Sequence, residues 1–224
     1  MNNVNIVALI PARRNSKGIK FKNRQEIGGV SLVGHALNFA KSCNFDEIII
    51  STDDEYFYEH ESFSKYCHRR DKGLSGDKSI VADVVQQYSL DGARKNDFFV
   101  VLEPTCFERK KHHLDFLFNG DFFRLDKSTF TSFVETPVHK EKIWGYEDGK
   151  MIPHPQVWKR RQEYEKQYVL SGHYYGLFLA KIAELYPSLC GSDVYPLIID
   201  DDFHIDIDNG IDLDIARIVL SSRE

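Results

Sequence analysis

Two segments near opposite ends of the chain carry opposite charges. Residues 13–24 hold six basic side chains and no acid, and residues 200–214 hold seven aspartates and no lysine or arginine. Lysine and arginine bind phosphate oxygens, whereas carboxylates bind hard cations such as Mg²⁺. If the fold brings both segments to one cleft, they would hold a polyphosphate together with its metal ion.

The basic segment follows an apolar run, residues 4–10, which is typical of a buried parallel strand. The turn after it therefore lies at the carboxyl end of a strand. Arg13 and Lys17 offer positive charge there, Gly18 permits unusual backbone conformations, and backbone N–H groups can cradle phosphate. A solvated basic loop is the alternative interpretation. The turn matches neither the Walker P-loop nor the dinucleotide-binding glycine motif.

The acidic segment contains Asp206 and Asp208 in a stretch, residues 203–208, that alternates apolar and acidic side chains. Residues i and i+2 of a strand face the same way, so both carboxylates are predicted on one face, where they suit Mg²⁺. The alternative is an acidic edge strand in which Asp208 caps the helix beginning at Gly210. An EF-hand is excluded, because no glutamate falls at the required twelfth position.

Strands and helices alternate through the first half of the chain. The pattern predicts strands at residues 4–10, 47–51 and 97–102, and helices at residues 31–41, 54–66 and 79–93. This alternation predicts an α/β fold with a doubly wound, mostly parallel sheet. Ligands in such sheets bind beyond the carboxyl ends of the strands.

The pattern changes after about residue 124. Further strands are predicted at residues 128–135, 142–146, 173–179 and 195–199, and a closing helix at residues 210–221. Residues 151–167 form a polar, aromatic stretch. We expect a single domain over residues 1–224, with an inserted arm at about residues 124–170 that packs on a second subunit to form a homodimer.

Composition limits the classes of protein that remain. The 224 residues are 42% hydrophobic and 28% charged, which fits one sizeable globular domain. No apolar run is long enough to span a membrane, and no basic region precedes the first apolar stretch, so we expect a cytoplasmic protein. The net charge of −5 argues against a general nucleic-acid binder. The four cysteines are widely spaced, so neither disulfides nor a zinc site is expected.

Residues 10–23 (IPARRNSKGIKFKN) resemble the opening signature of the acylneuraminate cytidylyltransferases, or CMP-sialic acid synthetases, which include legionaminate and pseudaminate enzymes. Later landmarks follow in the family's order at residues 51–53, 70–77, 103–109, 171–175 and 205–208. The resemblance implies a Rossmann-like nucleotidyltransferase. It would join CTP to a nine-carbon 2-keto sugar acid and release pyrophosphate, with Mg²⁺ or Mn²⁺ as cofactor.

The resemblance also implies roles for individual residues. Nucleotide binding falls to Arg13, Asn15, Ser16, Lys17, Lys22, Asn23, Arg70 and Asp77, sugar binding to Glu103, Lys142 and Arg161, and metal binding to Asp206 and Asp208. Arg13, Lys22 and Asp208 would be catalytic. Lys22 would stabilise charge on the departing pyrophosphate, and Asp208 would orient the metal or accept the proton.

Departures from the family pattern lie mainly on the sugar side. Glu103 stands where the family has Gln, Phe107 replaces Pro, Ser171 replaces Asn and Val169 replaces Arg. The identity of the sugar acid is therefore open. Three alternatives also stand: an inactive relative that binds nucleotide, a glycosyltransferase of similar fold with an Asp-x-Asp metal motif, and a nucleic-acid module. The acidic tail and the scarcity of aromatic residues in the basic segment oppose the last.

Overall fold

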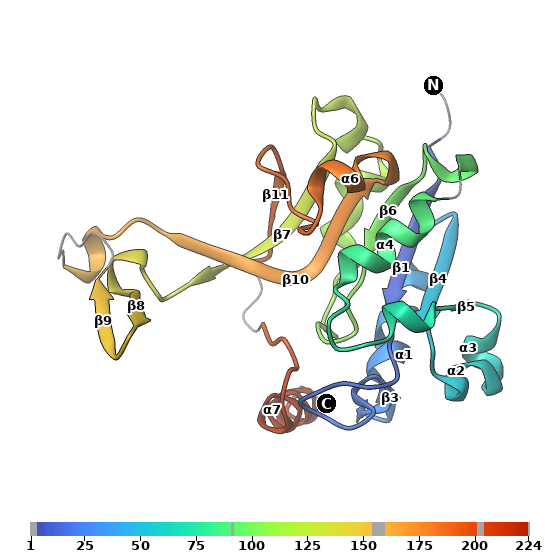
Figure 1. The fold of residues 1–224 in the computed structure, drawn as a ribbon, viewed down its shortest axis with the longest axis horizontal. Helices are drawn as coiled ribbons and strands as arrows, with labels where there is room; N and C mark the ends of the chain where they lie inside the picture. The colour runs from blue at the N-terminus through green and yellow to red at the C-terminus, as the bar shows by residue number, and fades with distance from the viewer. Residues whose placement is uncertain (1–3, 91, 154–159, 201–203, 224) are drawn as a thin grey trace.

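The computed structural model describes residues 4–90, 92–153, 160–200 and 204–223, and its centre is a seven-stranded sheet (Figure 1). In spatial order its strands are β11 (Tyr195–Ile198), β7 (Thr129–Thr136), β10 (Gln167–Phe178), β6 (Phe98–Val101), β1 (Ile6–Pro11), β4 (Glu47–Thr52) and β5 (Cys67–Arg69). Among these described strands only β10 runs antiparallel to its neighbours. The predicted α/β class with a mostly parallel sheet is confirmed.

The central strand β1 is apolar on both faces because helices cover both. Ile6, Ala8 and Ile10 face one core, and Val7 and Leu9 face the other. The first core is closed by α1 (Leu32–Ser42) and α5 (Asp115–Phe118), and the second by α4 (Val81–Ser89) and α6 (Ile182–Leu185). The carboxyl end of β1 therefore emerges from a rigid centre, which fixes where the basic loop begins.

Local capping explains where several helices begin and end. The predicted cap of α1 is confirmed, because the Ser31 hydroxyl accepts a hydrogen bond from the Gly34 N–H at 3.0 Å. The predicted helix over residues 79–93 is shorter, since α4 begins at Val81 and ends at Ser89. Its start is fixed by the Asp83 carboxylate, which accepts a hydrogen bond from the Ile80 N–H at 2.8 Å.

The single helix predicted over residues 54–66 was wrong. The chain instead forms α2 (Glu55–Glu59) and α3 (Glu61–Ser64), separated by His60, whose backbone is extended. The His60 Nδ1 atom lies 2.7 Å from the Tyr56 carbonyl oxygen, an acceptor that a continuing helix would use for its backbone. The chain then reaches β5, an edge strand that the sequence pattern did not reveal.

The second half of the chain builds a protruding arm. β7 and β10 leave the sheet together as a two-stranded ribbon, which carries the hairpin of β8 (Trp144–Glu147) and β9 (Lys150–Pro153) away from the body (Figure 1). The strand predicted at residues 142–146 starts later, because Lys140–Lys142 form a 3₁₀ turn. The strand predicted at residues 173–179 reaches back to Gln167, since it pairs with β7 along the ribbon.

Helix α7 (Gly210–Ser221) closes the chain beside the short hairpin of β2 (Glu26–Ile27) and β3 (Val30–Ser31) (Figure 1). The strand predicted over residues 203–208 does not form over its described part, residues 204–208, and Phe203 lies outside the described residues. The alternation is present nevertheless, because Ile207 is buried while Asp206 and Asp208 are exposed. Within the described ranges, no helix combines the length and apolarity needed to cross a membrane.

Candidate active site

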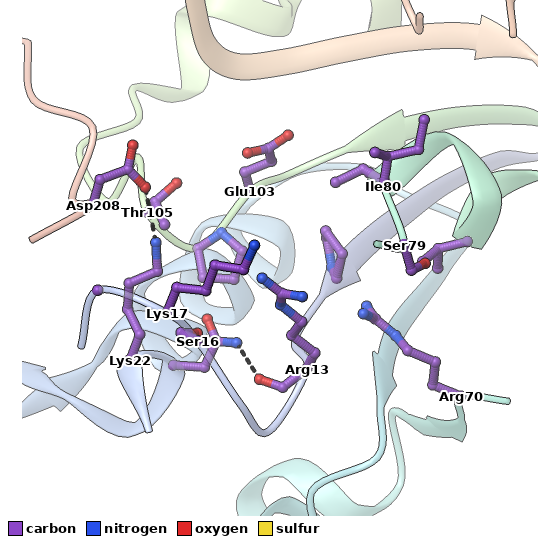
Figure 2. A pocket seen from close by; sticks show the side chains of 16 residues that line it. Arg13, Ser16, Lys17, Lys22, Arg70, Ser79, Ile80, Glu103, Thr105 and Asp208 are labelled. Atoms are coloured by element: carbon purple, nitrogen blue, oxygen red, sulfur yellow. Dashed lines mark hydrogen bonds and ion pairs between the residues drawn. The ribbon is translucent and has the colours of Figure 1, made fainter. Parts of the chain in front are cut away.

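A cavity of about 620 Å³ lies at the carboxyl ends of β1 and β6 (Figure 2). Five separate stretches of the chain line it: Pro11 to Asn23 (Pro11, Arg13, Ser16, Lys17, Gly18, Lys22 and Asn23), Arg70, the start of α4 (Ser79, Ile80, Val81 and Val84), Glu103 to Thr105, and Asp208. This is where ligands bind in open α/β sheets. The position agrees with the expectation from the sequence pattern.

The basic loop and the acidic segment meet at this cavity. The Lys22 ammonium donates hydrogen bonds to the Ile207 carbonyl oxygen at 2.9 Å and to the Asp208 carboxylate at 3.1 Å. Gly18 lies so close that a Cβ atom there would be 2.0 Å from the Asp208 carbonyl oxygen, so no larger residue fits without backbone movement. The predicted convergence of the two segments is confirmed.

Buried polar contacts hold the basic loop in shape. The Asn23 side-chain amide is buried and donates to the Arg13 carbonyl oxygen at 2.8 Å. The Arg24 guanidinium donates to the buried Asp54 carboxylate, with 2.7 Å between Nε and Oδ2. The loop thus presents its cations from a fixed backbone. The Asn23 amide, predicted to bind the nucleotide, is engaged here in positioning Arg13.

Two arginines enter the cavity from different elements. Arg70 is 5% exposed and donates to the Ser51 carbonyl oxygen at 3.0 Å. Burial lowers the pKa of Arg70 to about 10, so it remains a cation at neutral pH. Arg13 donates to the Gly76 carbonyl oxygen at 3.0 Å and lies 3.6 Å from the Asp77 carboxylate. Asp77 does not line the cavity, and its contact is with the Arg13 guanidinium.

Glu103 lines the wall formed by the segment after β6. Burial, together with the negative charges of Asp206 and Asp208, raises the pKa of Glu103 to about 7 against the opposing effect of Arg109 and Lys22. The Arg109 guanidinium donates to the Glu103 backbone carbonyl oxygen at 2.6 Å and to the His173 carbonyl oxygen at 3.1 Å. This arginine thus holds the backbone of the wall in place.

Several predicted site residues lie outside the cavity lining. Asn15 is exposed next to it. Lys142 is on the arm, with its ammonium 5.3 Å from the centre of the Tyr164 ring, and Arg161 opens a 3₁₀ turn on the same arm. Asp206 is exposed, and one of its carboxylate oxygens lies 3.8 Å from the Cys106 sulfur. Within the part of the chain that the structure describes, Asn15, Lys142 and Asp206 are therefore not among the lining residues.

The carboxylates near the cavity do not by themselves make a metal site. Among the residues that the structure describes, no group of three or more His, Cys, Asp or Glu side chains is placed to hold a metal ion. Asp208 lines the cavity with its side chain 76% exposed, and Asp206 is exposed two residues before it. Such carboxylates fit a hard divalent ion only if other oxygens complete its coordination, as the oxygens of a triphosphate would.

The sequence pattern missed part of the lining. Ile80, Val81 and Val84 form an apolar wall at the start of α4, and Ser79 precedes them. Apolar residues at helical spacing are typical of the core, so nothing in the sequence distinguishes a wall of the cavity from ordinary packing. Their proximity to the motif at residues 70–77 was the only available signal.

Comparisons with known proteins agree with this geometry. A family model described as cytidylyltransferase matches residues 7–103. An N-acylneuraminate cytidylyltransferase of Oncorhynchus mykiss is 38% identical over 86 residues, which cover 38% of this chain and 20% of that protein. The enzyme of the same name from Streptococcus agalactiae serotype III is 31% identical over 114 residues, which cover 48% and 27%. The match thus spans about a fifth to a quarter of these relatives.

Solved structures extend the similarity of fold to nearly the whole chain. A CMP:2-keto-3-deoxy-manno-octonic acid synthetase complexed with CTP superposes with a TM-score of 0.71 at 14% identity, covering 98% of this chain and 99% of that one. A 4-diphosphocytidyl-2C-methyl-D-erythritol synthase gives 0.64 at 15% identity, covering 97% and 100%. Residues 7–103 of this chain thus match the cytidylyltransferase family model, and the similarity of fold to these structures extends over nearly the whole chain.

Proposed function

We propose that the protein joins CTP to a nine-carbon 2-keto sugar acid of the sialic acid type, giving the CMP-sugar and pyrophosphate. The observation that carries the proposal is the meeting of the basic loop, Arg70 and Asp208 around one cavity. The proposed class of sugar is supported by two relatives that match part of the chain, because both are named N-acylneuraminate cytidylyltransferase. All four cysteines are free thiols, which fits the reducing cytoplasm that we propose as its location.

Different residues of the lining are assigned to different parts of the nucleotide. We assign the triphosphate to Arg13, Ser16, Lys17 and Lys22, which belong to one loop (Figure 2). Arg70 and Asn23 stand at the cytidine side of the proposed arrangement, and Asp77 acts by holding Arg13. Asn15 would reach the nucleotide by rotation of its exposed side chain. Fixed cations of this kind stabilise charge without reorganising during the reaction.

The reaction is an in-line displacement at the α-phosphorus of CTP. The anomeric hydroxyl oxygen of the sugar forms a new bond to the α-phosphorus as the bond to the bridging oxygen breaks. Pyrophosphate leaves with that electron pair, and the hydroxyl proton passes to Asp208 and then to water. Lys22 and Arg13 stabilise the charge that develops on the leaving oxygens. For this role, the Lys22 ammonium must donate to phosphate oxygens in place of part of its present hydrogen bonding to Asp208.

We assign the divalent ion, Mg²⁺ or Mn²⁺, to Asp206 and Asp208. Their spacing, their exposure beside the cavity and the hard oxygens they offer suit such an ion once a triphosphate supplies the remaining ligands. When bound, the ion would lower the pKa of the sugar hydroxyl and neutralise phosphate charge. The Lys22 ammonium also lies 3.1 Å from the Asp208 carboxylate and offsets part of its negative charge.

The arm is the proposed dimer contact. Large apolar side chains are exposed along it at Val138, Ile143, Trp144, Tyr146, Met151, Ile152, Tyr168, Val169 and Leu170. A surface of this kind on a protruding ribbon is typical of a subunit interface. In a dimer built through the arm, Lys142 and Arg161 would serve the sugar site of the partner subunit. Light scattering should then give twice the chain mass, and Trp144→Asp should give the monomer.

One assay separates the proposed function from its alternatives. Purified protein is incubated with Mg²⁺, a panel of 2-keto sugar acids and CTP, with ATP, GTP and UTP as controls, and pyrophosphate release is followed together with the CMP-sugar. Release of a nucleoside diphosphate would instead favour a glycosyltransferase. CTP binding without turnover on any acceptor would favour an inactive relative, and steeply salt-dependent binding of oligonucleotides would favour a nucleic-acid module.

A further inference from the structure

Glu103 is an acid in a cavity whose charged side chains are mostly cations. It follows the carboxyl end of β6, and its side chain extends into the cavity beside the wall that carries Thr105 and Asp208 (Figure 2). Within the described residues, no side chain or backbone group donates a hydrogen bond to its carboxylate. Arg109, a neighbouring cation, donates from Nε and Nη2 to the backbone oxygens of His173 and Glu103, and its buried Nη1 has no hydrogen-bond partner among the described residues. The carboxylate is therefore open to a ligand.

The surroundings of Glu103 make an anionic ligand costly at this point. The side chain is partly buried, and the negative charges of Asp206 and Asp208 act on its carboxylate against the opposing charges of Arg109 and Lys22. A sugar acid brings a further negative charge, its own carboxylate, into the same cavity. Like charges at short range in a partly buried site repel each other strongly. Binding becomes favourable if the acceptor also carries a positive group that meets Glu103.

The hydrogen bonds that Glu103 can form indicate which positive group the acceptor carries. A positive group placed beside Glu103 favours the ionised form of its carboxylate, which accepts hydrogen bonds and donates none, whereas a side-chain amide does both. An N-acetyl substituent offers one N–H donor but also a carbonyl oxygen that a carboxylate repels. An amidinium or ammonium offers donors only, and its hydrogen bonds to a carboxylate are charge-assisted and bidentate in the amidinium case.

We propose that Glu103 selects an acceptor sugar acid with a basic nitrogen substituent, an amidinium or ammonium, directed at its carboxylate. This inference rests on the proposed function and narrows its substrate class. It makes Glu103 a specificity-determining residue rather than a catalytic one, because its partner is a substituent and not the reacting hydroxyl. The positive substituent offsets the charge of the sugar acid's own carboxylate, so the acceptor enters the cavity close to neutral.

The test uses pairs of 2-keto sugar acids that differ at one position, N-acetyl in one and N-acetimidoyl in the other. The two groups have the same shape, and only an oxygen is exchanged for a protonated nitrogen. Each pair is measured with the wild-type protein, Glu103→Gln and a matched control, Glu184→Gln. Glu184 is an exposed acid on α6, paired with Lys181 at 3.0 Å and outside the lining. The readouts are kcat/KM for CMP-sugar formation and calorimetric binding with a non-hydrolysable CTP analogue.

Wild type and Glu184→Gln should prefer the amidinium acceptor by about tenfold or more, the effect of one charge-assisted hydrogen bond. Glu103→Gln should lose that preference while its melting temperature stays at or above that of wild type. The inference is overturned if wild type uses both acceptors equally, or if Glu103→Gln keeps the preference for the amidinium acceptor. In either case, turnover of the acceptors would still uphold the proposed function. A binding preference lost in Glu103→Gln, without turnover, upholds the inference and overturns the proposed function. Absence of both binding and turnover overturns both.

Discussion

The two walls of the cavity are built in different ways. The phosphate wall comes from one loop after the central strand, where Arg13, Ser16, Lys17 and Lys22 lie within ten consecutive residues. The acceptor wall joins residues from distant parts of the chain, Glu103 and Asp208. A short loop with fixed ends retains its geometry easily, whereas a wall made of separate segments can change one residue at a time.

This difference matches the departures from the family pattern. The basic loop keeps the cations expected of a cytidylyltransferase, and the acceptor side carries Glu103 in place of Gln. Lys142 and Arg161, the other proposed sugar contacts, are on the arm and not in the cavity of the same chain. On the assignments that we propose, the contacts to the nucleotide come from one subunit, whereas the contacts to the acceptor also include residues of the arm. Each prediction below tests one wall against the other.

The largest effect is expected at Lys22 on the phosphate wall. Lys22→Ala should lower CMP-sugar synthesis by about 10³-fold, because it removes a fixed cation from the departing pyrophosphate. The matched control is Lys20→Ala, an exposed lysine two residues away and outside the lining, which should stay within about twofold of wild type. Pyrophosphate release measures both. If Lys22→Ala kept more than a tenth of the activity, the phosphate wall would not be where we place it.

The next largest effect is expected at Asp208, where the two walls touch. Asp208→Asn should reduce turnover by about 10²-fold and weaken Mn²⁺ binding in the presence of CTP, measured by electron paramagnetic resonance. Asp214→Asn provides the control, because Asp214 is an exposed acid on α7. Unchanged Mn²⁺ affinity in Asp208→Asn would separate this residue from the metal and leave it a partner of Lys22 alone.

The pH dependence of stability should report on Glu103 of the acceptor wall and on His173, whose carbonyl oxygen accepts a hydrogen bond from Arg109 behind that wall. Burial lowers the pKa of His173 to about 3, so between pH 3 and 6.5 the unfolded chain binds more protons there and stability rises with pH. Glu103, with its pKa raised to about 7, binds its proton in the folded state, so it makes stability fall as pH rises between about 4.5 and 7. The two effects oppose each other in wild type.

Replacing either His173 or Glu103 should reveal the pH effect of the other residue on stability. Between pH 5 and 6.5, the unfolding free energy of His173→Gln should fall relative to wild type as pH rises, and that of Glu103→Gln should rise, each by about 2 kcal/mol. Urea unfolding at several pH values measures this. If the unfolding free energies of the three proteins changed in parallel with pH, neither His173 nor Glu103 would have the shifted pKa that its burial implies.

The smallest effect is expected at Arg70, which supports the nucleotide from the edge of the phosphate wall. Arg70→Lys should raise the KM for CTP by about tenfold with little change in kcat, because a lysine cannot reproduce the fixed guanidinium geometry. Arg69→Lys is the natural comparison. Arg69 is exposed and pairs with Glu55, and its replacement should leave the KM within about twofold. Equal effects of the two changes would show that Arg70 contributes structure only.

Much of the fold could be predicted from local patterns. The strands β1, β4 and β6 are short apolar runs between polar turns, and the cap at Ser31 marks the start of α1. The division of α2 from α3 at His60 could not be predicted, because it depends on a side-chain contact with the Tyr56 carbonyl oxygen rather than on periodicity. The apolar wall of Ile80 and Val81 was hidden for a similar reason, since burial against a ligand and burial in a core use the same residues.

The sequence by itself determined which charges exist and how they are spaced: a loop of cations after a buried strand and a tail of aspartates. Only the tertiary structure decided that the two meet. Lys22 and Asp208 are 186 residues apart in the chain. Their contact depends on Ile207, which packs with Ile27 and Leu213 in a third apolar core, and on Gly18, whose missing side chain lets the two backbones approach. Contacts of that range follow from packing, which no local pattern encodes.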